Sequence, residues 1–327
     1  MKYMILDISN LLYRTYYANK NEDELTIAGL AQHQALLTLN KYYREHNPDK
    51  IVMAFDRKAW RIEYTTSELC ISGKKYKGHR RKDMTEKERT KYENFLEHLR
   101  QFEELMKLHT SVICLAADGL VADDLVAGFV QKYASPENEI IAISTDKDYI
   151  QILQHENVKL IDPASGKERT LEEWGGDAGL FMFEKCIRGD TGDNVQSAYP
   201  RVRKTRIMKA WEDPLERVNM MEETWVNQEG KTMVVKEVFK ENEMLMDLSK
   251  QPQEWRDLMN KTIEENMENP GAFSLGKFML FLGKFEMKKV ADNVTTFAEM
   301  LSLSLIHISE PTRLRRKSRM PSSAWNR

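Results

Sequence analysis

The chain has 327 residues, of which 41% are hydrophobic and 31% are charged, and its formal net charge is −2. This composition indicates a soluble protein of one large or two smaller domains. The longest apolar stretches are only strand-sized, which argues against a membrane span, and Met1 leads into a strand-like run rather than a signal peptide. Three scattered cysteines, Cys70, Cys114 and Cys186, favour a reducing cytoplasm over a disulfide framework or a zinc site.

The end of the chain, Leu303–Arg327, differs in composition from the rest. Six Lys and Arg against one Glu give it a net charge of +5, which leaves −7 for the remainder. A basic tail can act as a nucleic-acid arm. The letters LSLIHISEPTR and SRMPSSAWN, however, resemble translated sequencing-adapter sequence. We therefore predict that residues 303–327 are not native and leave them out of the fold prediction.

The first half of the chain alternates predicted strands with predicted helices. The strands are Tyr3–Asp7, Ile51–Phe55, Ser111–Leu115, Glu139–Ser144 and Val158–Ile161. The helices are Asn10–Tyr17, Leu25–His46, Glu86–Leu108, Val121–Tyr133 and Phe181–Arg188. Strand, helix and parallel strand form the βαβ unit, so we predict an α/β fold with a mostly parallel central sheet flanked by helices.

The second half is predicted to be mostly helical. A loop rich in Gly, Asp and Asn, Gly189–Asn194, separates it from the first half. Its helices are predicted at Arg203–Trp211, Thr232–Leu248, Gln253–Met267 and Leu275–Asp292. The pattern places a domain boundary near residues 188–190, without a true linker.

Aspartates gather where the predicted strands end and helices begin. They are Asp7, Asp56, Asp123, Asp124, Asp146, Asp148, Asp190 and Asp193. For Asp146 and Asp148, the alternative is a strand-to-helix turn with an aspartate cap. Carboxyl ends of parallel strands share one edge of a sheet, where so many carboxylates would repel one another unless cations neutralise them. Oxygen ligands alone suit Mg²⁺ or Mn²⁺, and a two-ion site suits phosphodiester hydrolysis.

A basic segment follows the strand that precedes Asp56. Ten Lys, Arg and His residues lie between Lys74 and Lys91, with Tyr76 among them and Tyr64 before them. Such a run is often only a solvated face. Its position beside the predicted carboxylate site favours contact with a phosphate backbone.

Six motifs, in order, carry a resemblance to a known family: YMILDISNLLYRTYYA, VMAFDRKAWR, YKGHRRK, VADDLVAGF, STDKDYIQIL and GDTGDNVQSAYPRV. Together they resemble the flap endonuclease/5′→3′ exonuclease family, and within it the ribonuclease H branch of T-even-like bacteriophages. The resemblance implies a PIN-like (Rossmann-like) nuclease domain over residues 1–188 with a helical arch at about 58–108. It also implies a helical DNA-binding subdomain over residues 189–302, containing a degenerate helix–hairpin–helix-type motif.

The same resemblance implies roles for single residues. Asp7, Asp56 and Asp123 match ligands of a first metal ion, with Asp124 in or near its shell. Asp146 and Asp148 match residues between two ions, and Asp190 and Asp193 match the outer site. Lys77 and Arg80 match a pair that steers the scissile phosphate, so the catalytic candidates are Lys77, Arg80, Asp146 and Asp148. The nucleic-acid candidates are Tyr76, Lys77, Arg80, Arg81, Arg201, Arg203, Lys204 and Arg206. For Tyr76 and Tyr64, stacking on a base and packing under the arch are both open.

The chain departs from the family pattern at two places. Val121 stands where the family has a metal-ligand glutamate, so the first ion loses a ligand unless Asp118 compensates. The loop Ser197–Thr205 has no glycine, whereas the family motif is glycine-rich and binds K⁺ through its backbone. We expect DNA contact at this loop but no K⁺ site.

The predicted function is a Mg²⁺-dependent 5′→3′ exonuclease and flap endonuclease with ribonuclease H activity, using two ions with Mn²⁺ as a substitute. By family analogy it removes RNA primers and 5′ flaps at Okazaki fragments, acts as a monomer in the host-cell cytoplasm, and has a single-stranded-DNA-binding protein and a sliding clamp as partners. The alternative is a flap- or duplex-binding protein that Val121 has disabled. A nucleotide-binding Rossmann-like protein is disfavoured because neither G-x-G-x-x-G nor G-x-x-x-x-G-K-[ST] occurs.

Overall fold

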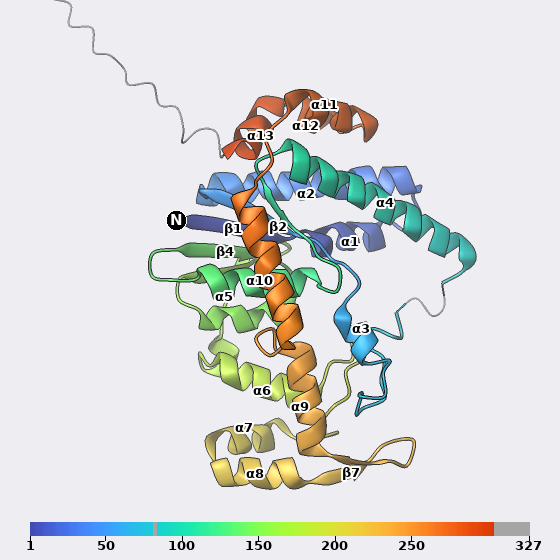
Figure 1. Ribbon diagram of the computed structural model, residues 1–327, viewed down its shortest axis with the longest axis vertical. Helices are drawn as coiled ribbons and strands as arrows, with labels where there is room; N and C mark the ends of the chain where they lie inside the picture. The colour runs from blue at the N-terminus through green and yellow to red at the C-terminus, as the bar shows by residue number, and fades with distance from the viewer. Residues whose placement is uncertain (81–83, 304–327) are drawn as a thin grey trace, which may run out of the picture.

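The computed structural model describes residues 1–80 and 84–303; the candidate Arg81 and, of the predicted adapter-derived residues 303–327, all but Leu303 lie outside them. A six-stranded sheet lies at the centre, in the order β3-β2-β1-β4-β5-β6 (Figure 1). All neighbouring strands are parallel except β5 and β6. The strands are β1 (Lys2–Asp7), β2 (Lys50–Ala54), β3 (Ile113–Leu115), β4 (Glu139–Ile143), β5 (Val158–Asp162) and β6 (Lys167–Arg169).

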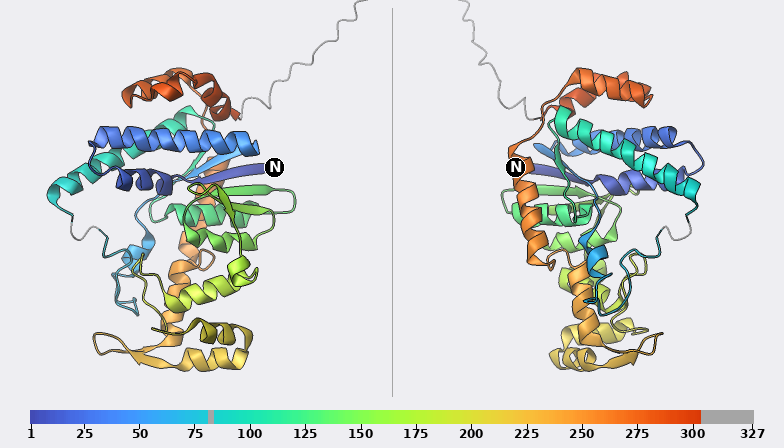
Figure 2. Two further views of the ribbon diagram at one scale, coloured as in Figure 1. Left: turned by 180° about the vertical axis from the view of Figure 1, so that it is seen from behind. Right: turned by 45° about the vertical axis from the view of Figure 1, so that its right-hand side comes forward.

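Alternate residues of β1 face opposite helical layers, because side chains in a strand alternate between its two faces. Met4 and Leu6 belong to a core shared with α1 (Ile8–Ala18), α2 (Glu24–His46) and α4 (Glu86–His109). Tyr3 and Ile5 belong to a second core, shared with α5 (Ala122–Tyr133) and α10 (Gln253–Glu268). The two helical layers enclose the sheet (Figures 1 and 2). The predicted α/β fold with a mostly parallel, helix-flanked sheet is confirmed.

The segment between β2 and β3 leaves the sheet, where a helical arch was predicted. Its described residues form α3 (Trp60–Tyr64), irregular backbone over 65–80, and the long helix α4 (Figure 1). A capping box starts α4: the Thr85 hydroxyl accepts from the Glu88 N–H, and the Glu88 carboxylate accepts from the Thr85 N–H. The first turns of α4 are exposed, and burial begins at Tyr92.

A separate small core lies at the far end of the molecule. It includes Phe183, Ile207, Met220 and Val238. The elements around it are α6 (Ala178–Arg188), α7 (Lys204–Glu212), α8 (Pro214–Glu222), β7 (Thr224–Val226), β8 (Thr232–Val234) and α9 (Val235–Met246). The helix predicted from Thr232 is shorter than expected, because Thr232–Val234 pairs with β7 as an antiparallel strand.

The last helices return to the sheet domain. From α9, α10 runs back along α5, and α11 (Leu275–Lys284), α12 (Lys288–Ala291) and α13 (Val294–Leu301) cover α2 and α4 (Figure 1). Their Phe278, Phe297 and Met300 are buried in the first core. The residues of the predicted subdomain over 189–302 are therefore divided among three cores, and the small core also includes Phe183 of α6, which precedes the predicted boundary. The helix predicted over 275–292 is interrupted where Glu286 adopts a φ of 53°.

Two short 3₁₀ helices, η1 (Lys147–Gln154) and η2 (Glu172–Trp174), complete the described elements. None of the helices in residues 1–80 and 84–303 has the length and apolar character needed to cross a membrane.

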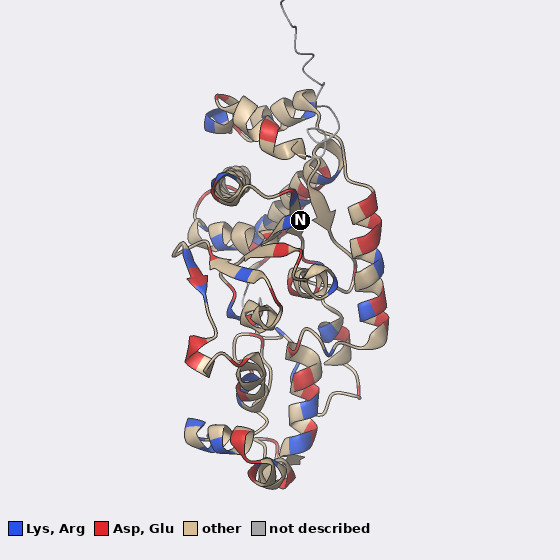
Figure 3. Cartoon of the chain, turned by 90° about the vertical axis from the view of Figure 1, so that its left-hand side faces the viewer, with Lys and Arg blue, Asp and Glu red and all other residues tan. Residues whose placement is uncertain are grey.

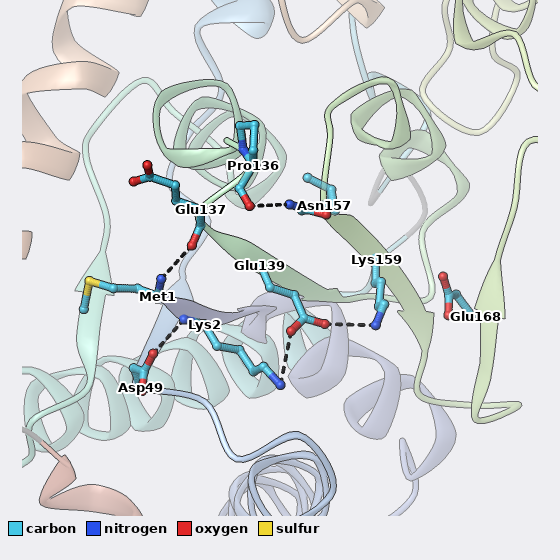
Figure 4. A pocket seen from close by; sticks show the side chains of 10 residues that line it. Met1, Lys2, Asp49, Pro136, Glu137, Glu139, Asn157, Lys159 and Glu168 are labelled. Atoms are coloured by element: carbon cyan, nitrogen blue, oxygen red, sulfur yellow. Dashed lines mark hydrogen bonds and ion pairs between the residues drawn. The ribbon is translucent and has the colours of Figure 1, made fainter.

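A polar hollow of about 630 Å³ lies at the amino edge of the sheet, opposite the aspartates (Figure 4). Both signs of charge line it. Glu139 lies 3.1 Å from Lys2 and 2.9 Å from Lys159, and the Met1 ammonium donates to the Glu137 carbonyl at 2.8 Å. The two edges of the sheet therefore differ: lysines accompany the carboxylates at the amino edge, whereas aspartates gather at the other.

Candidate metal centre

Three parallel strands end level with one another, and an aspartate follows each. Leu6 of β1 pairs with Met53 of β2 and with Ile143 of β4. Asp7 is the last residue of β1, and Asp56 and Asp146 follow shortly after β2 and β4. The register therefore brings three carboxylates predicted from the sequence to the same edge of the sheet.

The first turn of α5 adds a fourth carboxylate. Asp56 Oδ1 accepts a hydrogen bond from the Ala122 N–H at 2.8 Å, which ties β2 to the start of α5 just before Asp123. The hydroxyl of the fully buried Tyr149 lies 3.2 Å from Asp7 Oδ2, and burial, then the charge of Asp123, raises the pKa of Tyr149. We call this group the inner cluster: Asp7, Asp56, Asp123 and Asp146.

Burial and mutual repulsion perturb the inner cluster. Burial, then the negative charges of Asp56 and Asp146, raises the pKa of Asp7 to about 7. Burial, then the charges of Asp146 and Asp7, raises the pKa of Asp123 well above its ordinary value. Burial also raises the pKa of Asp56. Among the described residues, none of the four forms an ion pair with Lys or Arg. The cluster is therefore suited to bind cations.

A second group, the outer cluster, consists of Asp148, Asp190 and Asp193. Lys185 of α6 contacts Asp148 Oδ1 and lies 3.5 Å from Asp190 Oδ2. The Asp190 Oδ1 atom accepts from the Gly192 and Asp193 N–H groups. Unlike the inner cluster, this group already has positive partners within the protein.

Lys77 and Arg80 complete the neutralisation of the outer cluster. Arg80 Nη2 lies 2.6 Å from Asp193 Oδ1, and Lys77 Nζ lies 3.6 Å from Asp193 Oδ2. The Tyr76 hydroxyl donates to the same carboxylate at 2.6 Å. The structure thus brings the predicted phosphate-steering pair next to the predicted outer ligands.

Asp124, predicted to lie in or near the shell of the first metal ion, is paired with an arginine. It is fully buried, and both of its oxygens accept from the Arg61 guanidinium, at 2.9 and 2.7 Å. Gln251 Nε2 and the Val121 N–H donate to it as well. Because these donors occupy the carboxylate, we expect Asp124 to hold α3 against α5 rather than to contact an ion.

Val121 lies directly beside the inner cluster. It is the N-cap residue of α5, makes no side-chain cap hydrogen bond, and is 6% exposed. Its side chain belongs to the second hydrophobic core. At the position where a glutamate was expected by resemblance, the site therefore has an apolar wall.

Tyr76 and Tyr64 are engaged with the protein. Tyr76 is 5% exposed, with its hydroxyl on Asp193, and Tyr64 Oη lies 3.3 Å from Glu241 Oε1. Of the two roles left open for these tyrosines, packing under the arch fits this arrangement, and stacking on a base does not fit the buried Tyr76.

The basic candidates near α7 differ in their freedom. Arg201 and Arg203 are exposed or half-exposed without an ion pair among the described residues. Lys204 Nζ lies 3.8 Å from Glu184 Oε2, whereas Arg206 is bound to Glu223 and Tyr199. The glycine-free loop includes Arg201 at a φ of 61°.

Helix α10, unlike these basic residues, carries both signs of charge (Figure 3).

Sequence reasoning missed two residues of this centre. Tyr149 stands in an apolar stretch after Asp148 and reads as a core residue. Lys185 is a single lysine in the helix AGLFMFEKCIR. Tyr149 lies within the motif STDKDYIQIL but has no predicted role there, and Lys185 lies in none of the six motifs, since the contacts of both come from the tertiary fold.

The donor set of the inner cluster fits a divalent metal ion in its chemistry, because it consists of carboxylates that repel one another and that form no ion pair with a described Lys or Arg. Their oxygens are not drawn together: within residues 1–80 and 84–303, no three His, Cys, Asp or Glu side chains converge as ligands of one ion. Such spreading is expected of like charges before a cation gathers them.

Comparisons with known proteins agree with this arrangement. Residues 2–177 match the family described as 5′-3′ exonuclease, N-terminal resolvase-like domain. Ribonuclease H of Enterobacteria phage T4 is 26% identical over 200 residues, covering 60% of this chain and 63% of that protein. Flap endonuclease Xni of Shewanella piezotolerans is 30% identical over 200 residues, covering 59% of this chain and 70% of that protein. The match thus spans less than two thirds of the length of the phage T4 relative.

Solved structures share the fold. The 5′-exonuclease of phage T5 with bound divalent metal ions (zinc) has a TM-score of 0.59 at 21% identity, covering 82% of this chain and 99% of that chain. A complex of the bacteriophage T5 flap endonuclease with DNA and metal ions has a TM-score of 0.58 at 21% identity, covering 82% and 100%.

The raised pKa of Asp7 predicts a pH-dependent stability of the metal-free protein. Its pKa rises from an ordinary 3.8 to about 7 on folding, so the folded state binds more protons and the free energy of unfolding falls as pH rises through this window. Asp7→Asn retains an acceptor for the Asn10 N–H. In a chelator, we expect this variant to match wild type near about pH 4 and to exceed it near about pH 8 by on the order of 2 kcal/mol. Thermal unfolding across this range tests it; a difference that does not change with pH would contradict it.

The buried pair between Arg61 and Asp124 predicts a large stability effect. Arg61→Met leaves the Asp124 carboxylate buried without its main partner, which we expect to cost about 3–5 kcal/mol in the free energy of unfolding. Asp124→Asn in the same chain removes the stranded charge and should recover part of the loss. Urea unfolding measures the stability of Arg61→Met and of the double variant. If Arg61→Met is as stable as wild type, the pair is not what joins α3 to α5.

Proposed function

The chain belongs to the 5′-3′ exonuclease family, and from this we propose that it is a metal-dependent nuclease that cuts phosphodiester bonds at 5′ ends and 5′ flaps of nucleic acids. The observation that carries the proposal is the inner cluster. Four carboxylates lie together at the edge of the sheet without an ion pair to Lys or Arg among residues 1–80 and 84–303, and burial with mutual repulsion raises the pKa of Asp7 to about 7. A cluster this unfavourable suits a protein that recruits cations for its chemistry.

We assign the ligands by cluster. Asp7, Asp56, Asp123 and Asp146 would hold one Mg²⁺ or Mn²⁺, and Asp148, Asp190 and Asp193 would hold a second, with Asp146 and Asp148 close to both. Two such ions supply an activated water and a Lewis acid for the leaving oxygen. The protein's part is to keep the carboxylates at one edge, through the level strand ends and the bond from Ala122 to Asp56.

Cationic side chains would hold the substrate. Lys77 and Arg80 now bind Asp193, and an incoming phosphate offers them a second anion at the same place. Arg201, Arg203 and Lys204 lie on the loop and first turn of α7, where they are suited to grip duplex phosphates.

The biological role follows by family analogy alone. We propose that the substrates are DNA and RNA–DNA duplexes with 5′ ends or flaps, as left by RNA primers at Okazaki fragments. A single-stranded-DNA-binding protein and a sliding clamp are the partners proposed, with the enzyme acting as a monomer in the host-cell cytoplasm.

A second candidate is a flap- or duplex-binding protein without cleavage activity. Val121 favours it, because an apolar side chain at the rim of the inner cluster replaces an expected ligand. Against it stand the remaining carboxylates, for which a binding protein has no use.

Cleavage of a 5′-labelled flap or RNA–DNA duplex with Mg²⁺ separates the two candidates. We expect wild type to cut and Asp148→Asn to lose at least about 100-fold in rate, because the carboxylate between the two positions is gone. Val121→Glu should raise the rate by supplying the missing ligand, and Val121→Gln, of the same shape without charge, should not. If wild type and Asp148→Asn are equally inert, the nuclease proposal fails for this chain.

Salt dependence tests the duplex contacts. Each phosphate contact contributes about −0.9 to the slope of log affinity against log salt concentration. The double variant Arg203→Gln/Lys204→Gln should therefore make this slope less steep by the contribution of about two phosphate contacts. Arg206→Gln should change the slope less, because Arg206 is paired with Glu223. The measurement is flap-duplex affinity, by fluorescence anisotropy, in a series of salt concentrations. Equal slopes for all three proteins would remove α7 from the interface.

A further inference from the structure

A lysine ammonium lies between two carboxylates of the outer cluster. Lys185 is in the last turn of α6, contacts Asp148 Oδ1 and lies 3.5 Å from Asp190 Oδ2. Its side chain is 11% exposed, so the ammonium has exchanged most of its water for these two acceptors. Within the described residues, Lys185 is the counter-ion of Asp148 and Asp190.

The two clusters therefore start from different electrostatic states. At the outer cluster, Lys185 neutralises Asp148 and Asp190, and Arg80 and Lys77 neutralise Asp193. At the inner cluster, no Lys or Arg of the described chain forms an ion pair. A cation entering the inner cluster displaces no lysine or arginine of the described residues from an ion pair, whereas a cation entering the outer cluster has to displace an ammonium.

Displacement of Lys185 has a cost unless the ammonium finds another anion. An ammonium and a divalent cation a few ångströms apart repel strongly in partly buried surroundings. Lys185 is tethered by α6 and cannot move far. A substrate phosphate at this place would give the ammonium the anion that the ion takes from it.

We propose that Lys185 makes the metal affinities of the two positions unequal. It lowers the affinity of the outer position for a metal ion in the free protein, and this effect is removed when a nucleic-acid phosphate binds the ammonium. The inference rests on the proposed function, since it takes Asp148 and Asp190 as ligands of an ion. Lys185 acts here as a positioning residue. The outer ion and the nucleic acid then bind cooperatively, each raising the affinity of the other.

The test is a calorimetric titration of the metal-free, full-length protein with Mn²⁺, alone and with a phosphorothioate flap duplex that resists cleavage. We expect wild type alone to show one tight site and a second at least about tenfold weaker. The duplex should strengthen the second site. Lys185→Met should bring the second site close to the first without duplex and should lose most of the strengthening by duplex.

Lys147→Met is the matched control, because Lys147 is exposed and lies between Asp146 and Asp148 without an ion pair of its own among the described residues. It removes the same charge and should leave the second site weak. Lys185→Gln serves as a second variant if thermal unfolding shows that Lys185→Met does not fold.

Two outcomes overturn the inference: two equally tight sites in wild type without duplex, or variants of Lys185 that bind Mn²⁺ as wild type does. The absence of any tight site in wild type has a different meaning, because it would overturn the proposed metal-dependent function itself. Since no step of this experiment measures cleavage, a chain that Val121 has made inactive can still support or refute the role of Lys185.

Discussion

The repulsion among carboxylates at one edge of a parallel sheet is the constraint on which the rest of this molecule depends. β1, β2 and β4 end level because their buried residues, such as Met4, Ile5 and Leu6, are held between two helical layers. Whatever follows these strands is brought together, whether or not its charges attract. The burial of apolar side chains thus outweighs the repulsion and holds Asp7 in a place where burial and Asp56 raise its pKa to about 7.

The described residues meet this repulsion in three ways, and each gives a carboxylate a different role. Asp124 is paired with a fully buried arginine, which turns it into a structural link between α3 and α5. Asp148 and Asp193 are paired with Lys185 and Arg80, which are less buried than Arg61 and lie where a phosphate would compete for them. The inner cluster has only hydrogen bonds, from groups such as Tyr149 and the Ala122 N–H. The stronger the ion pair of a carboxylate in the protein, the less available that carboxylate is to a metal ion.

The sequence predicts the parts of this arrangement that depend on local pattern. Apolar runs ending in aspartate predicted β1, β2 and β4, and the parallel topology then brought Asp7, Asp56 and Asp146 together. The pairing of Asp124 with Arg61 was not predictable from the sequence. Asp124 is adjacent to Asp123, and its partner Arg61 is 63 positions away. The same holds for Lys185, whose partner Asp148 is 37 positions away. The division of the predicted 189–302 subdomain also escaped prediction, since the apolar faces of α10 to α13 do not reveal which core they join.

Charge counting favours a nuclease over a binding protein even with Val121 in place. A protein that only bound duplex DNA would gain by losing the inner carboxylates, because they repel both one another and the phosphate backbone. Replacing Asp7 or Asp123 by asparagine would remove that repulsion while keeping most hydrogen bonds. With Val121 in place of the expected glutamate, this edge has one negative charge fewer, which lessens the repulsion. Four carboxylates still lie there without an ion pair in the part of the chain that the structure describes. Without metal, the inner carboxylates oppose both folding and DNA binding. Bound metal ions would turn both repulsions into attractions, so this cluster is reasonable only where metal ions are present during function.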